Sequence, residues 1–138
     1  MFRCQIQVLS YLLGMLRNAL DQPDLRGRSE GTTWSALEIA VGLGNLLVNE
    51  QNMEIMLDRD VVPLLISLIG KGAVNEKECT ANALWVIAKN SKGKAKIKET
   101  ANAMEQLSRL STCGNQAVQD AAKRVLLELK DARNTRGI

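Results

Sequence analysis

The chain has 138 residues, a formal net charge of +3 and only two prolines, and its apolar residues are mostly Leu, Ala, Val and Ile. A compact fold of this length buries roughly two-thirds of the unfolded chain's surface, so a stable core needs no metal or disulfide. The small net charge does not by itself imply a polyanionic partner, and three widely spaced cysteines argue against a disulfide framework or a zinc site.

The helix-forming composition predicts an all-α protein. The first helix is expected at 4–20, where Gln5 and Gln7 interrupt the apolar run and no small-residue cleavage site follows, which argues against a signal peptide. A loop is expected at 21–31. The other expected helices lie at 33–48, 50–58, 62–70, 75–90, 94–101, 103–111 and 116–131. The longest apolar runs are about half the ~20 residues that a membrane helix needs, so we expect no transmembrane segment.

Two of these helices occur more than once. The stretch AVGLGNLLVN (40–49) returns in altered form as ANALWVIAKN (81–90), and DAAKRVLLELK (120–130) is a weaker third copy. At nearly the same shift, VVPLLISLIGKG (61–72) lies on AMEQLSRLSTCG (103–114). Within each copy the apolar residues recur three and four apart, which places them on one face of a helix. The chain therefore contains an internal repeat of amphipathic helices.

Local signals support these boundaries. Asn75 and Glu78 have the spacing of a capping box, and Asn115 offers a cap at the equivalent place in the next copy. Asp60 and Asn102 precede the two paired helices, and Asp and Asn are the non-glycine residues that best tolerate a left-handed backbone. We expect a bend at both positions.

The length of the period, the three helices in each unit and the pattern A-x-x-L-x-N-L in the long helix resemble the armadillo repeat family. The resemblance implies a right-handed superhelical α-solenoid, with a HEAT-like helical repeat as the alternative. It divides the chain into a partial repeat at 4–49, full repeats at 50–90 and 91–131, and a tail at 132–138. The loop at 21–31 is longer than is usual in the family.

In such a solenoid the long third helices line a concave groove that binds extended peptides or helices of partner proteins. The groove positions on the three long helices are Glu38, Val41 and Asn45, then Cys79, Asn82 and Val86, then Asp120, Lys123 and Leu127. The nuclear-import members hold basic peptides with a Trp and an Asn on each third helix. Here the Asn position holds Asn45, Val86 and Leu127, and the Trp position holds Val41, Asn82 and Lys123, so an import-type receptor of basic peptides is only an alternative.

Five lysines alternate through KNSKGKAKIKE and form a candidate basic patch: Lys89, Lys92, Lys94, Lys96 and Lys98. They could bind an acidic protein, nucleic acid or anionic lipid. No aromatic residues are interleaved to stack on bases, so nucleic acid is the less favoured partner. A solvated loop is the other interpretation of this stretch.

Catalysis has little support. The chain has no histidine, which excludes Ser-His and Cys-His pairs, and it has no P-loop or dinucleotide-binding motif. Glu50, Glu54 and Asp58 are spaced four apart, which predicts a solvated acidic stripe on one helix face. We expect no cofactor, no metal and no enzymatic activity.

These observations predict a protein-interaction scaffold or adaptor, cytoplasmic or nuclear, that binds a partner segment in its groove. One further alternative is a structural piece of a larger solenoid. In that case Val125, Leu126 and Leu129 of the last long helix would be uncovered, and the chain would self-associate through this helix.

Overall fold

The computed structural model describes residues 2–22, 24–29 and 32–130, and this part of the chain is almost entirely helical. It contains eight helices and one antiparallel hairpin. The helices are α1 (Phe2–Leu20), α2 (Ala36–Leu47), α3 (Glu50–Asp58), α4 (Val61–Lys71), α5 (Val74–Ala88), α6 (Ser91–Glu99), α7 (Ala103–Leu110) and α8 (Gln116–Lys130), and the strands are β1 (Arg26–Ser29) and β2 (Thr32–Ser35). The all-α class is therefore confirmed, and the expected tail at 132–138 lies outside the described residues.

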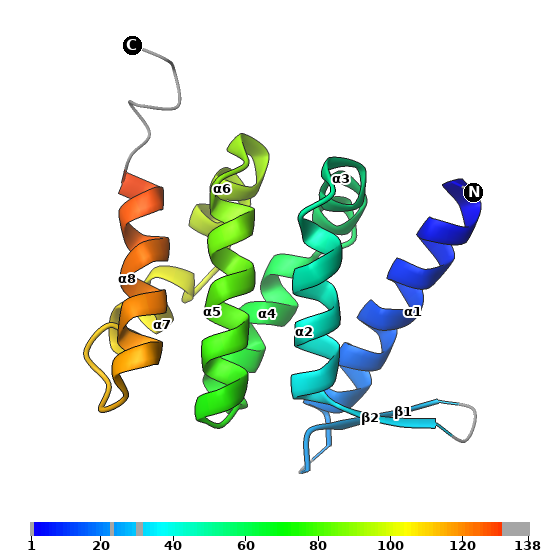
Figure 1. Ribbon diagram of the computed structural model, residues 1–138, viewed down its shortest axis with the longest axis horizontal. Helices are drawn as coiled ribbons and strands as arrows, with labels where there is room; N and C mark the ends of the chain where they lie inside the picture. The colour runs from blue at the N-terminus through cyan, green and yellow to red at the C-terminus, as the bar shows by residue number, and fades with distance from the viewer. Residues whose placement is uncertain (1, 23, 30–31, 131–138) are drawn as a thin grey trace.

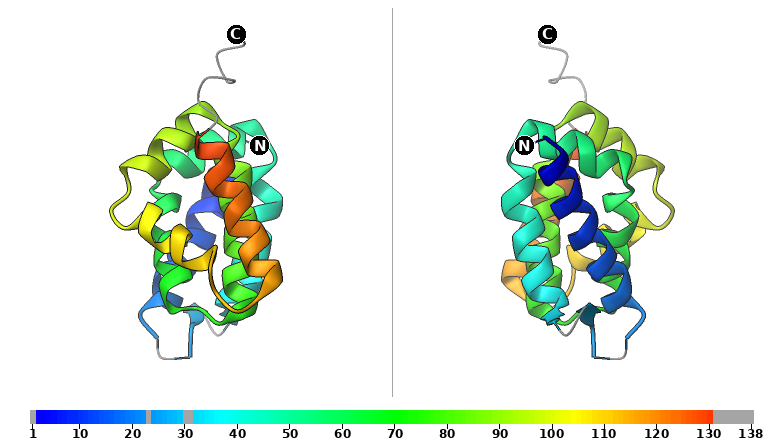
Figure 2. Two further views of the ribbon diagram at one scale, coloured as in Figure 1. Left: turned by 90° about the vertical axis from the view of Figure 1, so that its left-hand side faces the viewer. Right: turned by 90° about the vertical axis from the view of Figure 1, so that its right-hand side faces the viewer.

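The helices form two layers (Figure 1). The long helices α2, α5 and α8 stand side by side, and α5 packs against both of its neighbours. Behind them lie α3, α4, α6 and α7, as the side views in Figure 2 show. The contacts recur along the chain, because α4 packs on α5 as α7 packs on α8, and α3 and α4 contact α6 and α7 in turn. At the other end α1 contacts α2, α3 and α4. The order of helix packing thus follows the sequence period.

The segment between α1 and α2 differs from the expected loop at 21–31 and the expected helix start at residue 33. Here β1 and β2 pair as a hairpin. Thr and Trp favour strands, and two Thr and one Trp begin the second strand. Gly27 of β1 lies so close to α1 that an added Cβ would stand 2.5 Å from the carbonyl oxygen of Met15. The hairpin is therefore docked tightly on α1.

Asparagine side chains begin three of the helices. Asn49, Asn90 and Asn115 each accept a hydrogen bond from the backbone N–H three residues later, at 2.9–3.1 Å. These bonds satisfy one of the free N–H groups at the start of α3, α6 and α8. The cap predicted at Asn115 is confirmed. Asn49 and Asn90 are the last residues of the repeated stretch, so the repeat includes the cap of the next helix.

The capping box predicted at Asn75 and Glu78 is wrong. Helix α5 starts at Val74, and Glu76 reaches back so that its Oε1 accepts a hydrogen bond from Ala73 N at 2.8 Å. Alanine has no side-chain oxygen, so only the glutamate half of a capping box is present. The capping glutamate is thus Glu76 and not Glu78.

The two expected bends are confirmed. Asp60 and Asn102 have φ angles of 63° and 68° and stand directly before α4 and α7. Both residues occupy the left-handed region, which only short polar side chains and glycine adopt at low cost. The equivalent connections of the two copies therefore share one backbone conformation.

The core runs through both layers. Ala40, Ala81 and Ala122, the small residues of the three copies, are each at most 1% exposed. The uncovered apolar side of α8 that the larger-solenoid alternative predicts is not found, because Val125 and Leu129 are buried and Leu126 is half-buried. These side chains belong to the core because the apolar face of α8 is turned toward α5 and α7.

Candidate partner-binding face

The exposed side of α2, α5 and α8 carries all nine predicted groove residues. Five of them line one hollow of about 270 Å³ between α2 and α5: Val41, Asn45, Cys79, Asn82 and Val86. Small residues form its floor, since a Cβ added to Gly44 would stand 3.9 Å from the Cβ of Ala83. Close approach of the two helices thus keeps the hollow shallow and open to a partner.

The other four predicted groove residues lie outside this hollow. Glu38 is at the start of α2, where its Oε1 accepts a hydrogen bond from Ser35 N at 2.8 Å. This bond is the main reason why the pKa of Glu38 is lowered. Asp120 accepts a hydrogen bond from Gln116 Nε2 at 2.8 Å, and Lys123 and Leu127 are exposed on α8. Glu38 and Asp120 therefore stabilise their own helices.

Asn82 on α5 is hydrogen-bonded to a residue of α8. Its Oδ1 accepts a hydrogen bond from Arg124 Nη2 at 2.9 Å. The Arg124 guanidinium also lies over the Trp85 ring, at 5.3 Å from the centroid, and Lys89 Nζ lies 3.6 Å from the same centroid. The sequence does not predict these contacts, because nothing in the spacing indicates which way Arg124 turns.

A second hollow on the α1 side of α2 was not predicted. It measures about 770 Å³ and is lined mainly by apolar side chains from α1, α2 and β2: Gln7, Val8, Tyr11, Leu12, Trp34, Gly42, Asn45 and Leu46. Tyr11 and Trp34 are 42% and 39% exposed, which is high for aromatic side chains. Asn45 lines both hollows, so they adjoin each other across α2. The sequence signal for this hollow was Trp34 shortly after the expected loop, together with Tyr11 in the middle of the helix before it.

The five lysines do not form one patch of free cations. Lys89 covers Trp85, and Lys94 is only 6% exposed, with no hydrogen-bond partner for its Nζ within the described part of the chain. Lys92 Nζ contacts Asp58 at 2.8 Å and Glu54 at 3.3 Å. The predicted acidic stripe on α3 is thus partly paired, and it connects α3 to α6.

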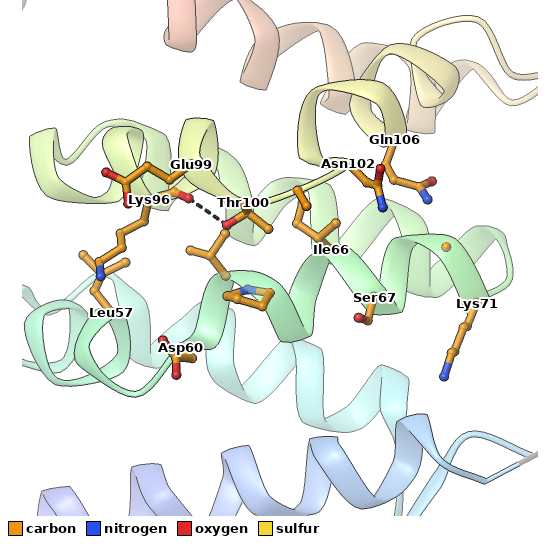
Figure 3. Close-up of a pocket in the computed structure, with 14 residues that line it drawn as sticks. Leu57, Asp60, Ile66, Ser67, Lys71, Lys96, Glu99, Thr100, Asn102 and Gln106 are labelled. Carbon is orange, nitrogen blue, oxygen red and sulfur yellow. Dashed lines mark hydrogen bonds between the residues drawn. The ribbon is translucent and has the colours of Figure 1, made fainter.

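In the other layer, a hollow of about 670 Å³ is lined by residues of α4, α6 and α7 (Figure 3). Asp60 and Asn102, the two left-handed residues, both line it, and Lys96 extends from α6 toward Leu57. Thr100 Oγ1 donates a hydrogen bond to Lys96 O at 2.7 Å, which ends α6. The hollow is mixed in polarity, and the described residues contain no cluster of His, Cys, Asp or Glu that could hold a metal.

The Lys92–Asp58 pair gives a pH-dependent prediction. The hydrogen bond from Lys92 lowers the pKa of Asp58, and the same bond raises the pKa of Lys92. The pair therefore stabilises the fold above the ordinary Asp pKa of 3.8 and below the ordinary Lys pKa of 10.5. This contribution is lost as pH falls through the folded Asp58 pKa or rises through the folded Lys92 pKa.

We expect Lys92→Met to lower the melting temperature at about pH 7 and low salt, and to have a smaller effect at about pH 2, because the ionic contribution of Asp58 is lost as the pH falls through its folded pKa. Thermal unfolding by circular dichroism across this pH range measures both. Lys98→Met, at an exposed lysine of the same helix, is the control. A Lys92→Met penalty of equal size at both pH values would contradict the ionic origin.

Two comparisons with known proteins were made, and neither identifies a related protein. Neither a scan against protein-family models nor a search of curated proteins finds a match for this chain. Across residues 2–22, 24–29 and 32–130, no helix has both the length and the apolar character needed to cross a membrane. The functional inference therefore depends on this chain's own residues.

Proposed function

We propose that this chain is a non-enzymatic interaction module, an armadillo-type right-handed solenoid that binds a segment of a partner protein on the face formed by α2, α5 and α8. The repeated packing of α2 on α5 and of α5 on α8 supports this fold. The unit of three helices, α3 to α5 and then α6 to α8, favours the armadillo type over the two-helix HEAT type. A cytoplasmic or nuclear location is part of the same proposal.

One observation carries the proposal. Residues from two helices, Val41 and Asn45 on α2 and Asn82 and Val86 on α5, line one open hollow on an exposed face. Side chains held on packed helices present a fixed surface, so a docking segment finds little to reorder in the scaffold. The mixture of apolar and amide groups suits a segment that offers apolar anchors together with backbone hydrogen-bonding groups.

The alternatives have less support. A receptor for basic peptides needs a repeated Asn, whereas only Asn45 occupies that position and Asn82 is bonded to Arg124. A basic-patch binder of acidic protein, nucleic acid or lipid needs free lysines, but Lys92 is paired and Lys94 is buried. Self-association through α8 needs exposed core residues, and Leu127 is the exposed large hydrophobic residue on that helix.

The test is selection of peptides from a displayed random library on the intact chain, followed by binding titrations with two matched variants. Val41 lines the hollow and is 46% exposed, whereas Val74 at the start of α5 is 45% exposed and is not part of its lining. We expect Val41→Glu to weaken binding of the selected peptides by about tenfold or more. Val74→Glu should leave binding within about twofold of the parent chain, a difference smaller than about 1 kcal/mol.

Alkylation of Cys79 gives an independent readout of the same site. Burial raises the pKa of its thiol, and the nearby charges of Glu78 and Glu76 raise it further, so iodoacetamide should modify it slowly near neutral pH. A bound peptide should slow the reaction at Cys79, which lines the hollow, and leave Cys113 unchanged. Equal binding to both valine variants together with an unprotected Cys79 would refute the proposal.

A further inference from the structure

Two cations converge on one aromatic ring where α5 meets α8. Lys89 Nζ lies 3.6 Å and Arg124 Cζ 5.3 Å from the centroid of Trp85, and the hydrogen bond to Asn82 fixes the guanidinium from a second direction. Lys89 and Arg124 are exposed, and Trp85 is half-buried beneath them. The cluster therefore holds two positive groups in defined positions on the proposed binding face.

This positive charge lacks an internal anion. Lys92 and Arg109 form ion pairs within the described residues, and neither Lys89 nor Arg124 takes part in one there. The ring faces compensate the two charges only partly. An anion beside the Trp85 ring therefore gains from the positive charge that these two side chains bring to this place.

The N–H groups of Arg124 that are not bonded to Asn82 are suited to binding a carboxylate. A guanidinium has five N–H groups, and the described hydrogen bond to Asn82 uses one of its nitrogens. The remaining fork can bind both oxygens of a carboxylate, and the planar group is already oriented by the Trp85 ring. Little side-chain freedom is then lost when the ligand arrives.

The residues around Arg124 and Lys89 indicate which kind of residue would lie next to an acidic residue of the partner. Leu127 is 68% exposed and follows Arg124 by three residues, so both lie on neighbouring positions of the α8 surface. Val86 of the α2–α5 hollow precedes Lys89 by three residues on α5 in the same way. An apolar residue next to the acidic one would therefore meet apolar side chains.

We infer that the cluster of Trp85, Lys89 and Arg124 binds an acidic side chain of the partner segment, flanked by an apolar residue that contacts Leu127. The inference rests on the proposed function, because it assigns the partner's chemistry at one end of the same face. The partner is thus a protein segment with at least one essential Asp or Glu.

The probe is a displayed library of random peptides, selected in parallel on the parent chain and on Arg124→Glu. Peptides from the parent chain are expected to share an Asp or Glu at one position, and those from Arg124→Glu to lose this preference. Each variant is first checked for an unchanged far-ultraviolet circular dichroism spectrum and melting temperature. If Arg124→Glu does not fold, Arg124→Gln and Lys89→Gln, which introduce no negative charge, replace it.

A charge exchange then separates direct contact from a general effect. A peptide selected on the parent chain should bind Arg124→Glu about tenfold or more weakly, and the same peptide with its acid changed to Lys should bind Arg124→Glu better than the parent chain. Lys98→Glu makes the same charge change at an exposed position of α6 and should alter binding by less than about twofold.

The outcomes distinguish this inference from the proposed function. Selected peptides that depend on Val41 but share no acidic position, or that bind Arg124→Glu and Lys98→Glu equally well, would overturn the acidic partner and leave the groove intact. If no selected peptide depends on Val41, the groove itself fails and the inference fails with it. Recovery of the Lys-containing peptide by Arg124→Glu supports both.

Discussion

Leu84→Ala is expected to lower the free energy of unfolding by about 2–5 kcal/mol, the range for removing a fully buried leucine side chain. Leu84 is 0% exposed at the centre of α5, and α5 packs against α2, α4, α6 and α8. The substitution removes apolar contacts and leaves a cavity that the surrounding helices can close only in part. Domains of this kind have a total stability of about 5–15 kcal/mol, so the loss is a large fraction.

Urea unfolding followed by circular dichroism measures this loss. The matched control is Leu127→Ala, the same chemical change at a side chain that is 68% exposed on α8. We expect the control to change stability by less than about 0.5 kcal/mol. Similar midpoints for the two variants would show that α5 is not the central packing element of the two layers.

The internal period explains why so much of the fold could be predicted from sequence. The helix α3 is found at Glu50–Asp58 as expected, and the other predicted helices end or begin within three residues of the observed ones. Residues such as Ala81 and Leu84 indicate a buried face because apolar positions three and four apart share one side of a helix. Their recurrence in a second copy argues against an accidental pattern.

The hairpin could not be predicted in the same way, because it occurs once and has no copy for comparison. Its strands have four residues each, and their stability depends on docking against α1 at Gly27. That contact joins segments that are distant along the chain, and local propensity does not report it. The start of α5 was misplaced for a related reason, since Ala73 is not a preferred cap residue.

The candidate site, like the fold, could be predicted from sequence only in part. The resemblance to armadillo repeats placed Val41, Asn45 and Asn82 in one groove, and these residues line a common hollow. The turn of Arg124 toward Asn82 and the aromatic surface made by Tyr11 and Trp34 depend on side-chain direction and on the position of the hairpin. Spacing along one helix determines which residues share a face, but not which residues of two helices meet across it.

Gly93→Ala is expected to destabilise the fold by about 1–3 kcal/mol, the usual cost of overpacking a tight contact. A Cβ at this position would stand 2.2 Å from the carbonyl oxygen of Ile87 and 2.7 Å from its Cγ2. Backbone atoms cannot move aside as a flexible side chain would, so α6 must shift away from the end of α5. The buried side of α6, including Ile97, would then lose contacts.

The first copy shows how the same junction is made with a larger residue. Asn52 occupies the position equivalent to Gly93 in the preceding copy, and its Nδ2 donates a hydrogen bond at 3.0 Å to the carbonyl oxygen of Leu46, the counterpart of Ile87. In the first copy the side-chain amide of Asn52 fills the space between the two helices. In the second copy the backbones approach closely at Gly93 and leave no such space. Alanine can do neither, because it is too large for the second arrangement and has no donor for the first.

Gly14→Ala is the control and should have the opposite sign. Gly14 lies inside α1, is exposed, and a Cβ there would meet nothing within 4 Å. The added methyl group reduces the freedom of the unfolded chain, so we expect a gain of about 0.5–1 kcal/mol. Equilibrium unfolding of the two variants under one set of conditions measures both changes. A stabilising Gly93→Ala would contradict the close approach of α6 to the backbone of Ile87.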